Sequence, residues 1–591
     1  RCKIKTNFRK NNRGGIEKEN GCRCDQINSL KLKFLILKCY SLPVEYKWTV
    51  LTNTTLGVIM SSLNANIVMI SLPTIFRGLN INPFVHNEFI YLLWILMGYS
   101  IVLATILVTF GRISDIYGRT RMYTTGFIIF TISSILLSIV PDNSGNMGAL
   151  LLIIFRMVQA VGGGFIMVNS TALLTDAFPV NERGKALGLN QSAFIIGSVL
   201  GLIGGGLLAG YNWHLVFIVN IPFALAGTFW SIFKLKELKE RKKVKIDYIG
   251  NITLGIGLVL ISLGFTYALE PYGDSQLGWE NPWVISSFIF GIISIIIFIY
   301  VEKNVENPLF NLSLFKIRPF TFGNFSLFFN SLARGAVSFL VTIWLQGIYL
   351  PLHGYSYTET PFWAGVYMLP MMVGMVSIAP LSGHLTDKYG ARIFATAGMI
   401  IVGISLFLLS LLPYNFNILE FEFILLLNGI GNGLFASPNT TAIMNSIYSK
   451  DRGTGNGMRM TFNNIGATIS MAVFFSITIT IFSQQVPEAM YNASINIVPQ
   501  SVALYLSKLS PSGLLFATFL GMDPLQAIKN SGSLPPSSIQ ALSSHTFLPS
   551  VIGPPFINGL RYSLFISLIL IVIGTIFSAL RGKKYVLELE R

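Results

Sequence analysis

The chain has 591 residues, of which 52% are hydrophobic and only 12% are charged. Soluble proteins usually carry about 25% charged residues, so this composition excludes an ordinary soluble protein and indicates an integral membrane protein. The net charge of +16 would also suit a nucleic-acid-binding protein, but its distribution along the chain, described below, argues against that reading.

Residues 1–48 precede the first long apolar run, and we expect them to form a cytoplasmic N-terminal segment. They hold all four cysteines, so no extracellular disulfide is expected, and the pattern Cys22-x-Cys24 alone does not predict a zinc site or any other metal site. The chain opens with Arg1, and its first methionine, Met60, lies inside the first predicted span. Whether residues 1–45 are native is therefore left open.

Fourteen apolar stretches follow. A helix needs roughly 20 apolar residues to cross about 30 Å of hydrocarbon, and each stretch satisfies this. An even number of spans places both termini on the same side. We predict the spans at residues 50–72, 89–110, 122–140, 149–174, 187–209, 215–233, 249–268, 283–301, 322–348, 361–383, 393–412, 422–446, 460–482 and 557–580.

Basic residues gather in alternate loops between these spans, with the densest run, KLKELKERKKVK, at 234–245. The intervening loops hold acidic residues and almost no Lys or Arg. By the positive-inside rule, the basic loops and both termini are cytoplasmic. We interpret the 234–245 run as a solvated linker near anionic lipid headgroups, so no nucleic-acid partner is predicted.

Two halves of the chain repeat each other. GRISDIYGRTR at 111–121 recurs as GHLTDKYGAR from residue 383, NSTAL at 169 as NTTAI at 439, and NERG at 181 as KDRG at 450. The three offsets, 272, 270 and 269 residues, agree closely, and repeated halves with a site between them are typical of transporters. We therefore predict a six-helix half at 49–235, a basic loop and two central helices at 236–305, and five helices of the second half at 306–482.

The segment 483–556 is rich in Ser and Pro and poor in charge. We predict it to be a long, partly ordered extracellular loop rather than a cap over the outer mouth. The last helix at 557–580 and a cytoplasmic tail at 581–591 complete the predicted organisation.

These patterns resemble the major facilitator superfamily, specifically its fourteen-helix drug:proton antiporters of the EmrB/QacA type, over about residues 50–580. The resemblance implies an all-α integral membrane fold with two six-helix halves and two extra central helices. It also implies a multidrug-type secondary transporter of the plasma membrane that exports amphiphilic small molecules in exchange for protons, by alternating access. Such a protein is not an enzyme and needs no cofactor.

The repeated charged turn resembles the loop between spans two and three of that superfamily. In the family this turn acts as a cytoplasmic latch between the halves, closed when the cavity faces outward. The alternative is that its charges only anchor a short loop at the headgroups. The residues matched in the two copies are Gly111, Asp115, Gly118, Arg119 and Arg121, and Gly383, Asp387, Gly390 and Arg392.

Span four contains LIIFRMVQAVGGG, which resembles the family's Arg-x-x-Gln-Gly motif at Arg156 and Gln159, with Ala160 replacing the glycine. An arginine at the bilayer centre costs roughly 2.5 kcal/mol or more, so it should face a polar interior and have a partner. Arg156 is predicted to line the substrate path. The alternative is a brace that hydrogen-bonds backbone carbonyls.

Span five carries five glycines whose spacing resembles the antiporter signature of the superfamily: Gly188, Gly197, Gly201, Gly205 and Gly206. Gly197, Gly201 and Gly205 share one helix face, which predicts close contact with another helix. Packing alone would explain them. The proline of the signature is Leu202 here, which weakens the implication of antiport.

Span one, SSLNANIVMISLP, has Asn64 where the family has an aspartate and Asn66 where it has a threonine. An amide does not titrate near neutral pH, so Asn64 carries no proton. No acidic residue lies in the middle of a predicted span, whereas Arg156 and Arg334 do lie within spans. The path is therefore predicted to be positive and to favour anionic or neutral amphiphiles.

Two other functions were weighed. A symporter that takes up or exchanges an organic anion or sugar differs mainly in the direction of coupling, which the sequence does not encode. An integral-membrane enzyme would need clustered carboxylates, and the acids here are scattered. No G-x-x-x-x-G-K-[ST] motif occurs, so ATP is not an expected partner. The substrate, the coupling ion and the oligomeric state stay open.

Overall fold

The structure is a computed structural model that describes residues 9–10, 16–17, 44–81, 88–237, 247–269, 272–273, 277–305, 308, 310, 312–448, 452–521, 535–542 and 544–582. The four cysteines and most of the basic run at 234–245 lie outside these residues. The chain divides into two units, residues 1–49 and 50–591. The first unit includes a short antiparallel pair, β1 (Arg9–Lys10) and β2 (Ile16–Glu17).

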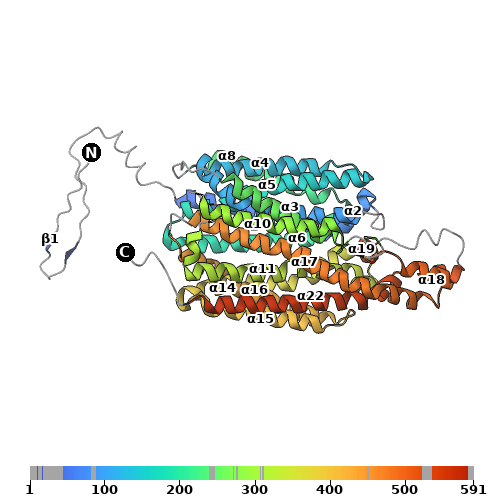
Figure 1. Ribbon diagram of the computed structural model, residues 1–591. Helices are drawn as coiled ribbons and strands as arrows, with labels where there is room; N and C mark the ends of the chain where they lie inside the picture. Colours follow the sequence, from blue (N-terminus) through green and yellow to red (C-terminus); the bar gives the residue numbers. More distant parts are fainter. Residues whose placement is uncertain are drawn as a thin grey trace. The chain divides into compact units, whose positions relative to one another are not determined.

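Helices make up the second unit (Figure 1). Its first half comprises α2 (Val44–Leu79, which begins in the first unit), α3 (Glu88–Tyr117), α4 (Arg119–Ser138), α5 (Gly145–Ala177), α6 (Val180–Tyr211), α7 (Leu215–Ile218) and α8 (Asn220–Lys234). The central pair is α9 (Tyr248–Tyr267) and α10 (Pro282–Asn304). The second half comprises η1 (Leu312–Lys316), α11 (Arg318–Ile343), η2 (Trp344–Tyr349), α12 (Leu350–Leu352), α13 (Thr360–Tyr367), α14 (Leu369–Tyr389), α15 (Ala391–Leu411), α16 (Ile418–Asn445), α17 (Arg452–Ser494), α18 (Gln500–Ser507), α19 (Pro511–Leu520), α21 (Pro536–Leu542) and α22 (Phe547–Leu580).

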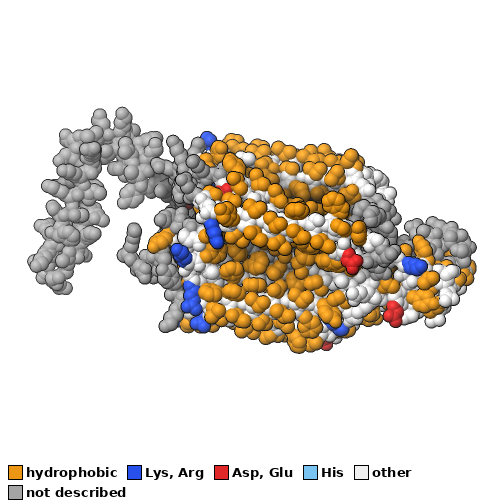
Figure 2. All heavy atoms as spheres, viewed as in Figure 1, with side chains coloured by type: hydrophobic (Ala, Val, Ile, Leu, Met, Phe, Trp, Pro, Cys, Tyr) orange, Lys and Arg blue, Asp and Glu red, His pale blue; other side chains and the backbone are white. Residues whose placement is uncertain are grey.

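The fourteen predicted spans are all helical. In the described part of the chain, thirteen helices are long and apolar enough to cross a membrane, and two bent pairs could each count as one more. One pair, Met97–Leu107 with Thr109–Tyr117, corresponds to the predicted span 89–110; the other is Gln500–Ser507 with Pro511–Leu520. Hydrophobic side chains cover the surface between the two ends of the helices, while Lys and Arg gather mainly at one end (Figure 2). The all-α membrane fold predicted from composition is therefore confirmed.

The segment predicted as a loop at 483–556 is largely helical where it is described. Helix α17 continues to Ser494 and α22 already begins at Phe547, so both helices are longer than the predicted spans. Between them, α18 and α19 meet at an angle of 90°, and α18 lies beyond the ends of most other helices (Figure 1). All ten residues of α19 are buried, against η2 and α17 among others, so its apolar residues pack into the protein rather than forming a loop.

The two halves repeat each other in space as they do in sequence. Helices α3 and α4 both pack on α5, and α14 and α15 both pack on α16. The same close contact recurs at equivalent glycines: a β-carbon on Gly126 would meet the carbonyl of Gly162, and one on Gly398 would meet the carbonyl of Gly431. Helix α9 packs on α10, on α3 and on α17, so the central pair contacts both halves.

Backbone contact at these glycines predicts a specific stability effect. In Gly162→Ala, the new β-carbon would lie 2.7 Å from the backbone nitrogen of Phe130 and 2.8 Å from the Gly126 carbonyl, so α4 and α5 must separate. We expect a loss of about 1–3 kcal/mol, the usual cost of overpacking, measured as a lower melting temperature of the detergent-solubilised protein. Gly204→Ala is the control, because no atom lies within 4 Å of its new β-carbon. Equal melting temperatures for the two variants would contradict the contact.

Candidate translocation site and latch

A polar cluster lies inside the first half, and we call Asn64, Ser134, Arg156, Gln159 and Asn220 the N-half polar cluster. The Gln159 Oε1 atom accepts hydrogen bonds from Asn64 Nδ2 at 3.0 Å and from Arg156 Nη1 at 3.1 Å. Gln159 Nε2 donates to Ser134 Oγ at 3.0 Å, and Asn220 Nδ2 donates to Asn64 Oδ1 at 3.4 Å. One amide thus joins α2, α4 and α5, and Asn64 extends the cluster to α8.

Arg156 places a positive charge in this cluster and is only 2% exposed. Its guanidinium lies 4.5 Å from the ring centroid of Tyr99, a cation–π distance. Among the described residues no carboxylate forms an ion pair with it, no backbone carbonyl accepts a bond from it, and its Nε has no hydrogen-bond partner. The predicted polar partner is therefore the Gln159 side chain, and the cluster keeps an uncompensated positive charge.

A small, partly open cavity lies in the second half and is lined by Arg334 of α11. Most of its lining is apolar, and it includes Met368, Met371 and Leu425. Within the described residues, Arg334 has neither a hydrogen bond nor an ion pair. The polar groups nearby are Asn428 and Ser405, and Asn428 Nδ2 donates to Ser405 Oγ at 2.8 Å.

The residues that line this cavity correspond, through the sequence repeat, to residues of the N-half polar cluster. Asn428 and Ser405 follow Gln159 and Ser134 by 269 and 271 residues and form the same amide-to-hydroxyl bond. At the same offset, Leu425 takes the place of Arg156 and Arg334 takes the place of Asn64. The arginine therefore comes from α5 in the first half and from α11 in the second, and both Arg334 and Leu425 line the cavity.

Asn66 lies apart from both groups. It is half-buried, its Nδ2 donates to the Ser62 carbonyl on the same helix at 2.9 Å, and its side chain faces Gly201 of α6. The structure therefore brings Asn64, Arg156 and Gln159 together, but not Asn66 or Arg334 with them.

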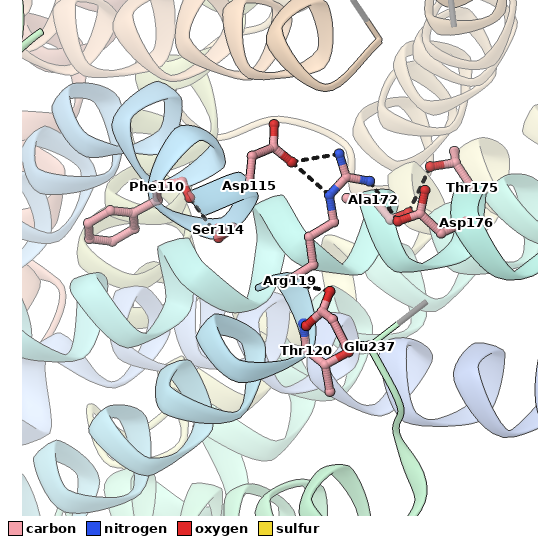
Figure 3. A network of polar contacts seen from close by, with 9 residues as sticks. All are labelled: Phe110, Ser114, Asp115, Arg119, Thr120, Ala172, Thr175, Asp176 and Glu237. Carbon is pink, nitrogen blue, oxygen red and sulfur yellow. Dashed lines mark hydrogen bonds and ion pairs between the residues drawn. The ribbon is translucent and has the colours of Figure 1, made fainter. Parts of the chain in front are cut away.

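The charged turn between α3 and α4 forms a second cluster of side chains, shown in Figure 3, which we call the latch cluster: Asp115, Arg119, Asp176 and Glu237. Arg119 Nη2 lies 2.7 Å from Asp115 Oδ1, and Arg119 Nη1 lies 2.7 Å from Asp176 Oδ2. The Glu237 carboxylate accepts from the backbone nitrogens of Arg119 and Thr120, both at 3.1 Å, at the positive N-terminal end of α4.

The turn depends on a glycine, because Gly118 has a φ of 107°, a conformation that other residues rarely adopt. Its repeat Gly390 has a φ of 85°. The second copy has Ala391 at the position of Arg119, while Arg392 is exposed, so it lacks the buried arginine. Gly111 and Gly383 lie near Val168 and Ser437, Arg121 is exposed, and the side chain of Asp387 is outside the described ones.

Among the described residues, the hydrogen bonds and ion pairs of the latch cluster join the first half and the start of the basic loop, and none reaches the second half. Contacts between the halves include the other end of the helices. There, Gly206 packs on Phe362 at the start of α13, Gly365 packs on Leu202, and Gln346 Nε2 donates to the Ile70 carbonyl at 3.4 Å. The halves therefore meet at the end opposite the latch cluster, and α17 of the second half also packs along α3 of the first.

Comparison with known proteins decides the family. Residues 54–471, well over half of the chain, match the model of the Major Facilitator Superfamily. The chain belongs to the major facilitator superfamily. It is therefore a multi-pass membrane transporter of small molecules and not an enzyme.

Three relatives show how this major facilitator protein compares with others. It is 32% identical to the riboflavin transporter RibZ of Clostridioides difficile, covering 73% of this chain and 88% of RibZ. It is 28% identical to the multidrug transporter MdtP of Bacillus subtilis, over 89% of this chain and 92% of MdtP. A bacterial homologue of the human lysosomal transporter Spinster, in an inward-facing structure, superposes with a TM-score of 0.54 at 14% identity, over 92% of this chain and 97% of that one.

The glycines of span five in this major facilitator protein make the predicted close contact. A β-carbon on Gly197, Gly201 or Gly205 would meet the carbonyls of Ile59, Leu63 and Ile67 on α2 in turn. Gly188 is exposed and has no atom within 4 Å of its β-carbon position, so it is not part of this contact. These three glycines allow α6 to pack closely on α2, next to Asn64.

The sequence did not indicate two other polar features near these sites. Glu237, in the basic linker, looked like a solvated charge, yet it caps α4. Asp247 with Gly250, at the start of span seven, resembles the family, but its closeness to Glu302 was not predicted, because 55 residues separate them; the two acids are 6% and 3% exposed.

Arg119 is the residue on which the latch cluster depends. We expect Arg119→Gln to lower stability by about 1.5–3 kcal/mol, the usual worth of hydrogen bonds to charged groups, because it leaves Asp115 and Asp176 facing each other. Thermal unfolding in detergent measures this. Arg121→Gln is the matched control, since Arg121 lies in the same turn but is exposed. A similar drop in both variants would mean that general charge, and not this cluster, stabilises the turn.

Proposed function

We propose that this protein is a proton-linked exporter of amphiphilic small molecules in the plasma membrane, which works by alternating access. Relatives named multidrug resistance protein 3 and multidrug transporter MdtP, both of Bacillus subtilis, support export of drugs. The fourteen helical stretches support the EmrB/QacA-type group within the superfamily. The gathering of Lys and Arg at one end of the helices supports cytoplasmic termini.

The organisation of the chain follows from this proposal. The halves 49–235 and 306–482 with 557–580 tilt against each other, and the central helices within 236–305 accompany them. Contact at the end opposite the latch cluster corresponds to the state that is closed to the outside. The residues that meet substrate are Asn64, Arg156, Gln159 and Arg334. The latch cluster, together with its incomplete second copy, biases the equilibrium between inward and outward states.

The proposed preference for anionic or neutral substrates rests mainly on Arg334, which has no ion-pair partner among the described residues and lines the cavity. A cation without a carboxylate in a largely apolar pocket attracts an anionic group and repels a cationic one. Arg156 adds a second uncompensated positive charge in the other half. The preferred substrates are therefore anionic or neutral amphiphiles rather than cationic ones.

A second candidate is a transporter of a flat, polar aromatic compound or another organic anion, working by uptake or exchange. Similarity to the riboflavin transporter RibZ supports it. The two candidates share the cavity and differ in the substrate and in the direction of coupling.

Ligand-induced stabilisation tests the preference. The purified protein would be heated with matched cationic, neutral and anionic amphiphiles and with riboflavin. A ligand at 100 times its Kd adds about 2.7 kcal/mol to the stability of the folded state, which raises the melting temperature. We expect anionic and neutral compounds to stabilise the protein and Arg334→Gln to remove the anionic effect.

Arg392→Gln serves as the control, since this arginine of the same half is exposed and far from the cavity lining. Stabilisation by cations alone would overturn the predicted preference. Stabilisation by riboflavin alone would favour the second candidate over multidrug export.

A further inference from the structure

Two buried carboxylates lie where the central helix pair begins and ends. Asp247 precedes α9, and its Oδ1 accepts a hydrogen bond from the backbone nitrogen of Gly250 at 2.8 Å. Glu302 lies in the last turn of α10, and its Oε2 accepts from the backbone nitrogen of Phe310 at 3.0 Å. We call Asp247 and Glu302 the carboxylate pair.

Gly250 brings the remaining oxygens of this pair together. A β-carbon on Gly250 would lie 2.5 Å from Asp247 Oδ2 and 2.8 Å from Glu302 Oε1, so both oxygens occupy the space that a side chain would fill. Asp247 is 94% buried, given its 6% exposure, and its Oδ2 has no hydrogen-bond partner among the described residues. An unsatisfied oxygen of Asp247 thus lies near an oxygen of a second buried carboxylate.

Arg112 of α3 supplies the compensating charge. Its guanidinium interacts electrostatically with Glu302, Asp247 and Asp115, in decreasing order. Of the other described charged groups on these elements, Lys303 and Lys316 are exposed, and Arg459 of α17 donates to Asn456 and Thr440. Within the described part of the chain, Arg112 thus acts on both buried carboxylates and also on Asp115.

We propose that the carboxylate pair is a proton-binding site, occupied by one proton when Arg112 withdraws and emptied when Arg112 returns. Like charges in a buried place favour protonation of one of them, and an opposite charge favours their ionised form. The guanidinium and the proton therefore compete for the same oxygens. The proton comes from water at the α9 start and returns there, and no bond other than O–H forms or breaks.

A proton fits this site better than a metal ion. In the part of the chain that the structure describes, no three His, Cys, Asp or Glu side chains lie together as a metal would require. Arg112 lies one helical turn before Asp115, which accepts a hydrogen bond from Arg119, so the pair and the latch cluster adjoin the same end of α3. The role of this site in transport rests on the proposed proton-linked function, whereas proton binding itself does not.

Infrared difference spectroscopy of the full chain in lipid nanodiscs, titrated with acid, tests the site. A protonated carboxyl gives a carbonyl stretch that shifts in heavy water. We expect this band in the wild type and in Glu280→Gln, which changes an exposed acid, and its loss in Asp247→Asn and Glu302→Gln. Asparagine at 247 still caps α9, so the first variant should fold. A band that survives in both variants would overturn the proposal.

Arg112→Gln gives an independent measurement. Because it removes the competing cation, we expect the pH midpoint of the same band to rise by about 1–3 units. An unchanged midpoint would show that Arg112 and the proton do not compete.

Transport in proteoliposomes then separates the two proposals. We expect Asp247→Asn and Glu302→Gln to keep ligand-induced stabilisation but to lose the dependence of transport on a pH gradient. If the wild type binds the proton and its transport ignores the gradient, the proposed function is wrong and the site stands. If wild-type transport follows the gradient and both variants do so equally, the site is wrong and the function stands.

Discussion

A charge inside an apolar helix bundle must find its partners within the protein, and the interior of this chain is arranged around that constraint. Arg156 is buried between helices, and a single amide, that of Gln159, accepts a hydrogen bond from it. Because the same amide also binds Asn64 and Ser134, three helices are fixed relative to one another by one side chain. An aspartate at position 64 would neutralise Arg156, whereas asparagine satisfies the hydrogen bond and leaves the charge available.

The two halves are repeats of each other, yet their buried arginines, Arg156 and Arg334, lie in different surroundings. The two halves keep the amide-to-hydroxyl bond, as Gln159 with Ser134 and as Asn428 with Ser405, so the backbone scaffold is equivalent. Only the origin of the arginine differs, since Arg334 comes from α11 and Leu425 stands where Arg156 would be. One scaffold therefore holds a hydrogen-bonded arginine in one half and, in the other, an arginine that lines a small cavity.

The spans and the charged turns were predictable because each is encoded locally, by apolar length and by a short motif. Asn64 and Asn66 were grouped as one site, yet residues two apart lie about 200° around a helix, and only Asn64 faces the cluster. Helix α19 was missed because its ten apolar residues are too few for a span and lie within a Ser- and Pro-rich segment. The carboxylate pair was missed because its members meet only through the packing of α9 on α10 at Gly250.

The carboxylate pair lies at the ends of the two central helices, which contact both halves. Helix α9 packs on α3 of one half and on α17 of the other, so its cytoplasmic end, as the charge distribution predicts it, adjoins both bodies that move in alternating access. A change of one charge at Asp247 and Glu302 acts on Arg112 directly and reaches Arg119 through Asp115. If transport is proton-linked as we propose, a first span that carries an amide in place of a titrating acid requires the proton to bind elsewhere. The carboxylate pair next to the latch cluster is the place we propose, outside the proposed substrate path.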